Sequence, residues 1–189
     1  MSRTITIEKE IFKYEELSER AKEKVRYNNG ECDLEFETDN LKYDFTEQLK
    51  EKYPYFENPE FIWSLSNSQG DGLSFSSDFN IGLYLKEFYP KMSNWKYDFI
   101  CNNLTIYVKY NNGYYCYACS SCVDYDYHTN RCYKIYDDIL SHIEDLYIDV
   151  CKEFEKQGYM AYEYLYTDDY AKELSEINEY EYDIDGNIF

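Results

Sequence analysis

The apolar positions in the last third of the chain repeat at helical spacing and form its clearest pattern. They fall three or four residues apart, which places them on one face of a long helix that Gly158 is expected to end. Thr167 is a good N-cap for a last helix that runs to about Ile177. The final residues predict a small hairpin that turns at Asp185-Gly186. The stripe of the long helix consists of Ile135, Ile139, Ile143, Leu146, Val150 and Phe154.

The first third of the chain has helical periodicity in two shorter stretches. Ser18 can cap a helix over 19–27, and residues 28–30, which include a glycine, are expected to end it. Thr38 can cap a second helix, which should stop at the Tyr-Pro pair of 53–54 because the residue before proline disfavours helical geometry. The apolar face of this second helix carries Leu41, Phe45 and Leu49.

The centre of the chain is rich in short segments that are typical of β-strands. Two predicted hairpins join 61–66 to 73–76 and 104–110 to 114–127. A strand over 4–12 and a short helix over 81–89 are also expected. Helices at both ends of a strand-rich centre indicate an α+β fold, in which helices pack on one face of an antiparallel sheet.

The size of the chain fits one such core. It has 189 residues, of which 44% are hydrophobic, and no linker or internal repeat divides it. We therefore expect residues 1–189 to form a single domain. No segment approaches the length of an apolar membrane span, and the opening residues lack the apolar core of a secretory signal.

Charge changes the picture more than size does. The chain has 38 acidic and 19 basic side chains, so direct binding of nucleic acid through a basic surface is not expected. Residues 133–189 alone hold sixteen acidic and four basic side chains. Many of the 25 tyrosines lie among these acids. A solvated helix face and AT-rich codon usage explain this composition in one interpretation, and a surface that binds a basic protein partner explains it in the other.

If the acidic surface binds a partner, the contact residues should lie near the C-terminal end. Two tyrosines are then apolar anchors among carboxylates that attract the partner. The candidate partner-binding residues are Tyr166, Asp168, Asp169, Tyr170, Glu173, Glu176, Glu179, Glu181, Asp183 and Asp185.

Four of the seven cysteines have the spacing of a metal site. Cys116, Cys119, Cys122 and Cys132 resemble a zinc or iron–sulfur ligand set. In the strand predicted over 114–127, however, Cys119 points away from Cys116 and Cys122, and no glycine or proline lies between them to form a tight knuckle. Free thiols are therefore favoured over a metal, and disulfides are disfavoured because nothing indicates secretion.

No other residues predict catalysis. A cysteine nucleophile needs a histidine base, and the chain has only His128 and His142. No pair of carboxylates stands out in an apolar setting. We expect no catalytic residues, no bound metal and no cofactor, and hence a protein that is not an enzyme.

The sharpest local motif is the loop of Gln69, Gly70, Asp71 and Gly72. Its glycines allow positive φ and a tight turn. A phosphate-binding P-loop would carry a lysine and open a helix, whereas a strand follows here. A structured hairpin turn and a recognition loop, for example for a nucleotide signal, remain as the two interpretations.

Three segments together resemble one family of small phage and prophage proteins. Phe12–Val25 resembles the family's opener F-x-E-L-S-E-E-A-K-E-K-A, and Ser66–Phe75 resembles its central segment W-S-Q-G-D-G-A-S-F. Glu176–Phe189 resembles its tail A-N-x-Y-x-F-x-E-D-G-K-I-F. The chain departs from the family at Asn67, where tryptophan is usual, and in its cysteine-rich segment over 114–123.

The resemblance implies a place of action more than a reaction. It implies a counter-defence protein in the cytoplasm of a bacterial host, such as an anti-CRISPR inhibitor whose partner is a CRISPR-Cas effector. Such effectors hold nucleic acid in a positively charged channel, which an acidic nucleic-acid mimic can occupy. An antitoxin that neutralises a small basic toxin is the alternative partner-binding function, and a nucleotide-binding protein that uses residues 69–72 is the third.

Overall fold

The structure of the chain is a computed structural model, which describes residues 10–66, 68–110, 121–128 and 133–189. The chain divides into two compact units. The terminal unit consists of residues 1–39 and 160–189, and the sheet unit consists of residues 40–159. The expectation that the whole chain forms a single domain stays a prediction.

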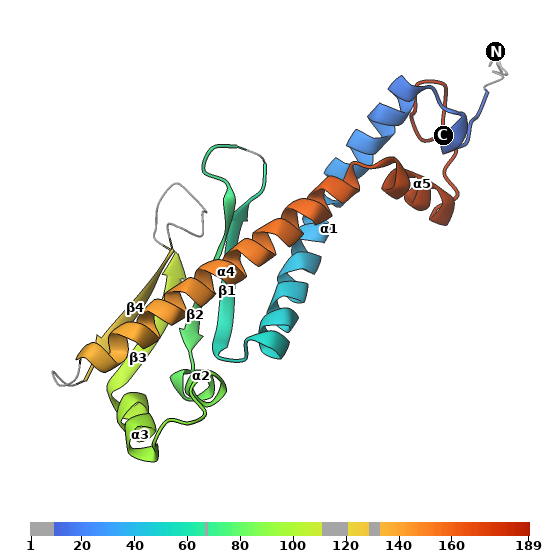
Figure 1. Ribbon diagram of the computed structural model, residues 1–189. Coiled ribbons are helices and arrows are strands. Elements are labelled where there is room, and N and C mark those ends of the chain that lie inside the picture. Colours follow the sequence, from blue (N-terminus) through green and yellow to red (C-terminus); the bar gives the residue numbers. More distant parts are fainter. Residues whose placement is uncertain (1–9, 67, 111–120, 129–132) are drawn as a thin grey trace, which may run out of the picture. The chain divides into compact units, whose positions relative to one another are not determined.

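Helices and strands follow one another in the order expected for an α+β protein (Figure 1). Their bounds are η1 (Tyr14–Glu16), α1 (Glu19–Lys52), β1 (Phe56–Ser64), β2 (Gly72–Phe79), α2 (Ile81–Phe88), α3 (Asn94–Asn103), β3 (Leu104–Tyr110), β4 (Ser121–Tyr127), α4 (Tyr133–Leu165) and α5 (Asp168–Ile177).

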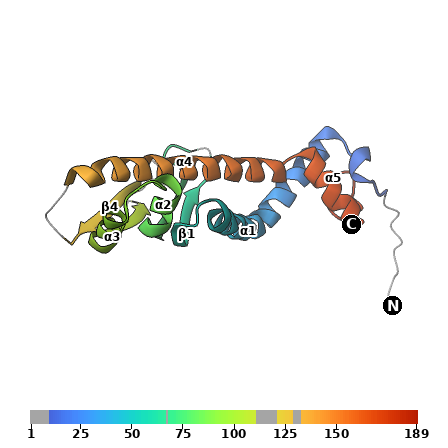
Figure 2. The ribbon, with the colours of Figure 1, turned by 60° about the horizontal axis from the view of Figure 1, so that its bottom comes forward.

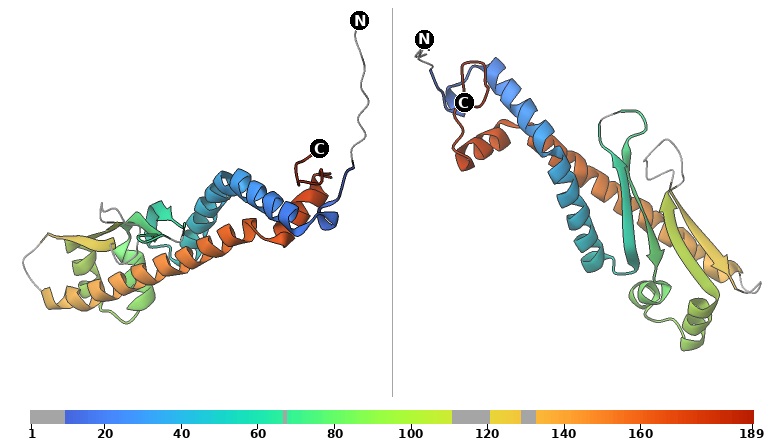
Figure 3. Two further views of the ribbon diagram at one scale, coloured as in Figure 1. Left: turned by 90° about the horizontal axis from the view of Figure 1, so that it is seen from above. Right: turned by 180° about the vertical axis from the view of Figure 1, so that it is seen from behind.

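The sheet unit contains a four-stranded antiparallel sheet in the order β1-β2-β3-β4. The predicted central hairpin is confirmed, with Phe61 opposite Phe75. Along β3, Ile106 and Val108 are buried, whereas Tyr107 between them is 42% exposed. Helix α4 covers the buried face (Figure 1), and the view from behind shows no described helix across the other face (Figure 3, right). The α+β prediction, with helices on one face, is therefore confirmed.

Aromatic side chains fill the core between this sheet and its helices. Phe45 of α1 stacks on Phe154 of α4 with ring centroids 4.6 Å apart. Tyr147 of α4 donates its hydroxyl to the backbone oxygen of Phe75 in β2. A buried hydroxyl needs such a partner, so this bond fixes α4 on the sheet.

The second helix predicted to begin at Thr38 is part of α1, in which the Thr38 hydroxyl donates to the Leu34 backbone oxygen. Two predicted helix ends are also wrong, both for one physical reason. Helix α1 continues through 28–30, and α4 continues through Gly158 to Leu165. A Cβ at Gly30 would lie 2.4 Å from the Tyr166 ring, and one at Gly158 would lie 2.6 Å from a Leu65 methyl. Both glycines allow close packing inside a helix and do not end it.

Other expectations differ in their outcome. The helix over 81–89, the strand over 104–110 and the stop before Pro54 are confirmed. Helix α3 was not expected, because its apolar positions form no regular stripe. Residues 4–9 and 111–120 lie outside the described part of the chain, as do their predicted strand and turn.

The terminal unit has a small core of its own. Residues from η1, the start of α1, α5 and the final segment meet there: Tyr14, Leu17, Ala21, Val25, Ala171 and Tyr182. Figure 2 shows these elements gathered together, with α5 beside the start of α1. The predicted cap is confirmed, since the Thr167 hydroxyl accepts a bond from the Tyr170 backbone N–H. The expected turn is also present, with Gly186 at φ +77°.

Candidate functional site

The terminal unit carries the strongest excess of acidic side chains. Residues 10–39 hold ten acidic and five basic side chains, and residues 160–189 hold nine acidic and one basic. All ten candidate partner-binding residues lie in this unit. The structure therefore groups the candidates in one compact unit, together with the acidic first half of α1.

The two predicted anchors, Tyr166 and Tyr170, are partly buried inside the unit. The Tyr166 hydroxyl donates to Glu31, and the Tyr170 hydroxyl donates to Asp33 at 2.6 Å. Burial, together with these carboxylates, raises the pKa of both tyrosines. Both rings thus join the end of α4 and the start of α5 to α1, which gives them a structural role that the sequence did not predict.

Asp168 is the candidate acid that bonds to side chains of both η1 and α1. Its Oδ1 accepts bonds of 2.5 Å from the Tyr14 hydroxyl and from the Arg26 guanidinium. These two hydrogen bonds lower the pKa of the Asp168 carboxyl. Asp168 therefore holds α5, η1 and α1 together, and its charge is largely balanced inside the unit.

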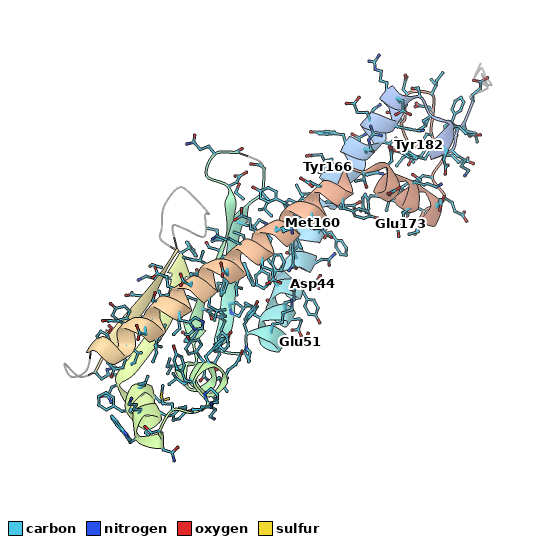
Figure 4. All side chains as sticks on the ribbon, in the orientation of Figure 1. Asp44, Glu51, Met160, Tyr166, Glu173 and Tyr182 are labelled. Carbon is cyan, nitrogen blue, oxygen red and sulfur yellow. The ribbon has the colours of Figure 1, made fainter. Side chains whose placement is uncertain are left out.

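Four further candidates also have partners within the unit, among them Glu173, which lies on α5 (Figure 4). Glu173 accepts a bond from Tyr164, and Asp183 accepts bonds from the final turn at Asn187. Two more are in surface ion pairs, Glu176 with Lys172 and Glu181 with Lys13. Surface ion pairs of this kind contribute little to stability, so these carboxylates stay accessible to a partner.

The remaining candidates are the acids with the fewest internal contacts. Asp169, Glu179 and Asp185 are exposed, and their side chains form no ion pair or hydrogen bond within the described residues. Glu163, which the sequence analysis did not single out, is in the same situation. Like the exposed Glu23 and Glu35 of α1, these four carboxylates carry charge that no ion pair within the described residues balances.

A cavity of about 550 Å³ lies beside this acidic surface. Its lining includes Tyr14, Glu15, Lys172, Glu176, Glu179 and Glu181. Lys172 is neutralised by Glu15, with an Nζ to Oε1 distance of 2.8 Å. The cavity therefore presents a net negative charge over an aromatic wall, which suits an arginine or lysine side chain.

Exposed apolar side chains of the terminal unit are the feature that sequence analysis missed. Ile177 is 71% exposed and Ile184 is 68% exposed, and Phe36 on the first half of α1 is 69% exposed. Ile184 stands between two aspartates, which gave it the appearance of a turn residue in the sequence. Exposed apolar side chains surrounded by polar ones match the apolar core and polar rim of protein interfaces.

The loop of residues 69–72 forms a closed turn at the β1–β2 hairpin. Asp71 accepts bonds from the Ser64 hydroxyl at 2.6 Å, from the Ser66 hydroxyl and from the Ser68 backbone N–H. These bonds lower the pKa of Asp71. Gly70 and Gly72 both have positive φ, as the motif predicted. The carboxylate is thus used to build the turn, which supports the structural interpretation of the loop.

Little of the predicted cysteine cluster falls within the structure. Cys116, Cys119 and Cys132 lie outside the described residues, and Cys122 lies on β4 as a free thiol. Among the described residues, no group of three or more histidine, cysteine or acidic side chains is placed to hold a metal. Cys151 is a buried free thiol on α4, and burial raises its pKa to about 12.

Both histidines are close to hydroxyl groups. His142 Nδ1 is within hydrogen-bond distance of the buried Tyr84 hydroxyl, and His128 Nε2 lies 3.1 Å from the Thr105 hydroxyl. Neither ring contacts a cysteine in these bonds. Among the residues that the structure describes, the histidines therefore have hydroxyl partners and no hydrogen bond to a cysteine.

Comparison of the chain with protein-family models, with curated proteins and with solved structures finds no match. In the described part of the chain, the helices are too polar or too short to cross a bilayer.

Proposed function

We propose that the chain is a non-enzymatic inhibitor that binds a basic surface of a bacterial immune effector through the acidic terminal unit. The observation that carries the proposal is a group of exposed acids without internal partners, among them Glu163, Asp169, Glu179 and Asp185, in one unit with exposed isoleucines. Acidic side chains attract the partner over a distance, and apolar side chains stabilise the contact.

The kind of partner follows from the charge. A surface that must accept a strongly acidic protein is rich in lysine and arginine, and nucleic-acid channels are the most extended surfaces of this type. RNA-guided nucleases have such channels. The resemblance of the sequence to phage proteins supports the same partner, a CRISPR-Cas effector whose channel the acidic unit shields.

The loop at 69–72 is a weaker candidate because the Asp71 carboxylate is already bonded to three groups of its own hairpin. Binding of a small basic toxin would use the same acidic surface, so the antitoxin function is separated from inhibition by the identity of the partner.

The test is a plasmid-interference assay in bacteria that each carry one type of RNA-guided nuclease. We expect the wild-type chain to restore transformation in the strain whose effector it binds. A terminal-unit variant, Glu163→Lys, Asp169→Lys, Glu179→Lys and Asp185→Lys, should lose this effect while its circular dichroism is unchanged.

A matched control reverses four exposed acids of α4 in the sheet unit, Asp137, Asp138, Glu144 and Asp145, to lysine. It changes the net charge by the same amount and should still inhibit. Equal loss in both variants, or inhibition that survives in the terminal-unit variant, would overturn the proposal. If the chain neutralises a basic toxin and has no effect on any nuclease, the acidic surface serves the antitoxin function instead.

A further inference from the structure

One cavity of the sheet unit differs in charge from the surfaces described so far. It has a volume of about 580 Å³ and lies where α2 and α3 meet, at one end of the sheet (Figures 1 and 3). Its lining includes Phe88, Tyr89, Pro90, Lys91, Met92 and Lys96, and no acidic side chain. By contrast, the cavity of the terminal unit and the one on the open sheet face are both lined by carboxylates. We call it the α2–α3 cavity.

The lysines of the α2–α3 cavity are not neutralised. Lys91 and Lys96 are exposed, and neither forms an ion pair within the described residues. Lys52 and Lys109 of the same unit do form ion pairs, with Glu153 and Asp124. The nearest acids in sequence, at positions 87 and 98, do not line the cavity. Lys91 and Lys96 therefore contribute two positive charges to the lining of the cavity, which contains no carboxylate.

The rest of the wall is apolar and partly exposed. Phe88 is 37% exposed. Trp95 lies outside the lining but next to Lys96 in the chain; its ring lies 6.0 Å from the Lys96 Nζ and it is 62% exposed. Pockets of a few hundred cubic ångströms with apolar walls and a few charged groups are typical of sites for small ligands. The composition of this cavity matches a ligand that combines an anionic group with a flat ring.

We infer that the α2–α3 cavity binds a nucleoside phosphate, with the phosphate on Lys91 and Lys96 and the base against Phe88, Pro90 and Met92. Lysine ammonium groups bind phosphate as point charges, and aromatic side chains stack on bases. A single small anion is favoured over a nucleic-acid strand. The net charge of −19 disfavours a polyanionic strand, which would lie along more of the acidic surface than a mononucleotide does, whereas acids more than about 8 Å from a small ligand are largely screened at physiological salt.

This inference is independent of the proposed function, because it uses the sheet unit and no residue of the acidic surface. It also moves the nucleotide hypothesis from the loop at 69–72, where Asp71 is engaged, to a part of the fold that the sequence analysis did not single out.

Tryptophan fluorescence provides a direct test because the chain has only two tryptophans, Trp63 and Trp95. In a Trp63→Phe background, Trp95 is the only tryptophan reporter. We expect adenosine 5′-monophosphate to change its emission in a saturable way. Adenosine and inorganic phosphate should each bind at least about tenfold more weakly, because each supplies only half of the contacts.

The decisive variant is Lys91→Glu with Lys96→Glu, which should weaken binding by about tenfold or more. Its control is Lys152→Glu with Lys156→Glu, two exposed lysines of α4 in the same unit, which should bind as the parent does. No saturable change with the nucleotide, equal affinity for inorganic phosphate, or equal loss in both variants would overturn the inference. Tighter binding of a single-stranded oligonucleotide than of the mononucleotide would also overturn it.

Discussion

At the scale of single residues, carboxylates in this protein have two distinct uses that the sequence does not separate. Asp168 and Asp169 are neighbours, yet Asp168 accepts bonds from Tyr14 and Arg26, whereas the Asp169 side chain has no ion pair or hydrogen bond within the described residues. The difference depends on which residues of α1 and η1 face α5. Those partners are more than 140 positions away in sequence, so local pattern analysis could not reveal them.

Replacing Asp168 by asparagine should destabilise the protein at neutral pH by at most about 1 kcal/mol, since the side chain is 63% exposed and solvent screens the pair. Its folded pKa is lowered, so the stabilisation is present above the unfolded pKa of about 4 and is lost as pH falls below it. Urea unfolding at several pH values should show the gap between wild type and Asp168→Asn closing in acid. Asp169→Asn is the control and should show no gap; an equal gap for both variants would contradict this account.

The Asp71 carboxylate provides a second prediction at the residue scale. Asp71→Ala removes the acceptor of two serine hydroxyls and one backbone N–H, so it should lower the denaturation midpoint and speed hydrogen exchange in the β1–β2 hairpin. Asp71→Asn keeps one acceptor oxygen, so its denaturation midpoint should lie between those of the wild type and Asp71→Ala. The variant should still bind the partner when folded. Loss of binding without loss of hairpin protection would instead support a recognition loop.

At the scale of elements, periodicity predicted most helices and strands but placed two helix ends wrongly. The stripes at Leu41–Leu49 and, within the described side chains, Ile139–Phe154 were read correctly because each faces a core. The errors lie at Gly30 and Gly158, where a glycine signals a stop in sequence and close packing in the structure. A sequence alone does not distinguish these two uses, since the contacting residues, Tyr166 and Leu65, come from other elements.

This difference can be measured with alanine substitutions. Alanine in an open helix stabilises it relative to glycine, by about 1 kcal/mol. Gly30→Ala should instead destabilise the protein, by about 1–3 kcal/mol, because its Cβ meets the aromatic ring of Tyr166 at 2.4 Å. Gly158→Ala should cost less, since its Cβ meets a Leu65 methyl that can rotate away.

The control for Gly30→Ala is the double variant with Tyr166→Ala. Removing the ring should cancel most of the cost of the added methyl, which calorimetry of the four-member mutant cycle would show. Additive effects of the two substitutions would mean that the contact with the Tyr166 ring is not the cause of the destabilisation by Gly30→Ala.

At the scale of the whole molecule, the location of the acidic residues matters more than their number. The sequence predicted an acidic C-terminal third, and the structure adds the first half of α1 to the same compact unit. It also separates residues that build the unit, such as Tyr166 and Tyr170, from exposed ones such as Ile177 and Ile184. Exposure depends on tertiary packing, so the sequence could indicate the acidic surface but not its apolar members.

The central claim is that the terminal unit provides the charge that guides binding, and the association rate tests it most directly. We would immobilise the effector found in the interference assay and measure association with wild type, the terminal-unit variant and the matched sheet-unit variant at low and physiological salt. The account predicts that salt slows wild type and the sheet-unit variant alike, and that the terminal-unit variant associates at least about tenfold more slowly at low salt. Equal association rates for the two variants would contradict it.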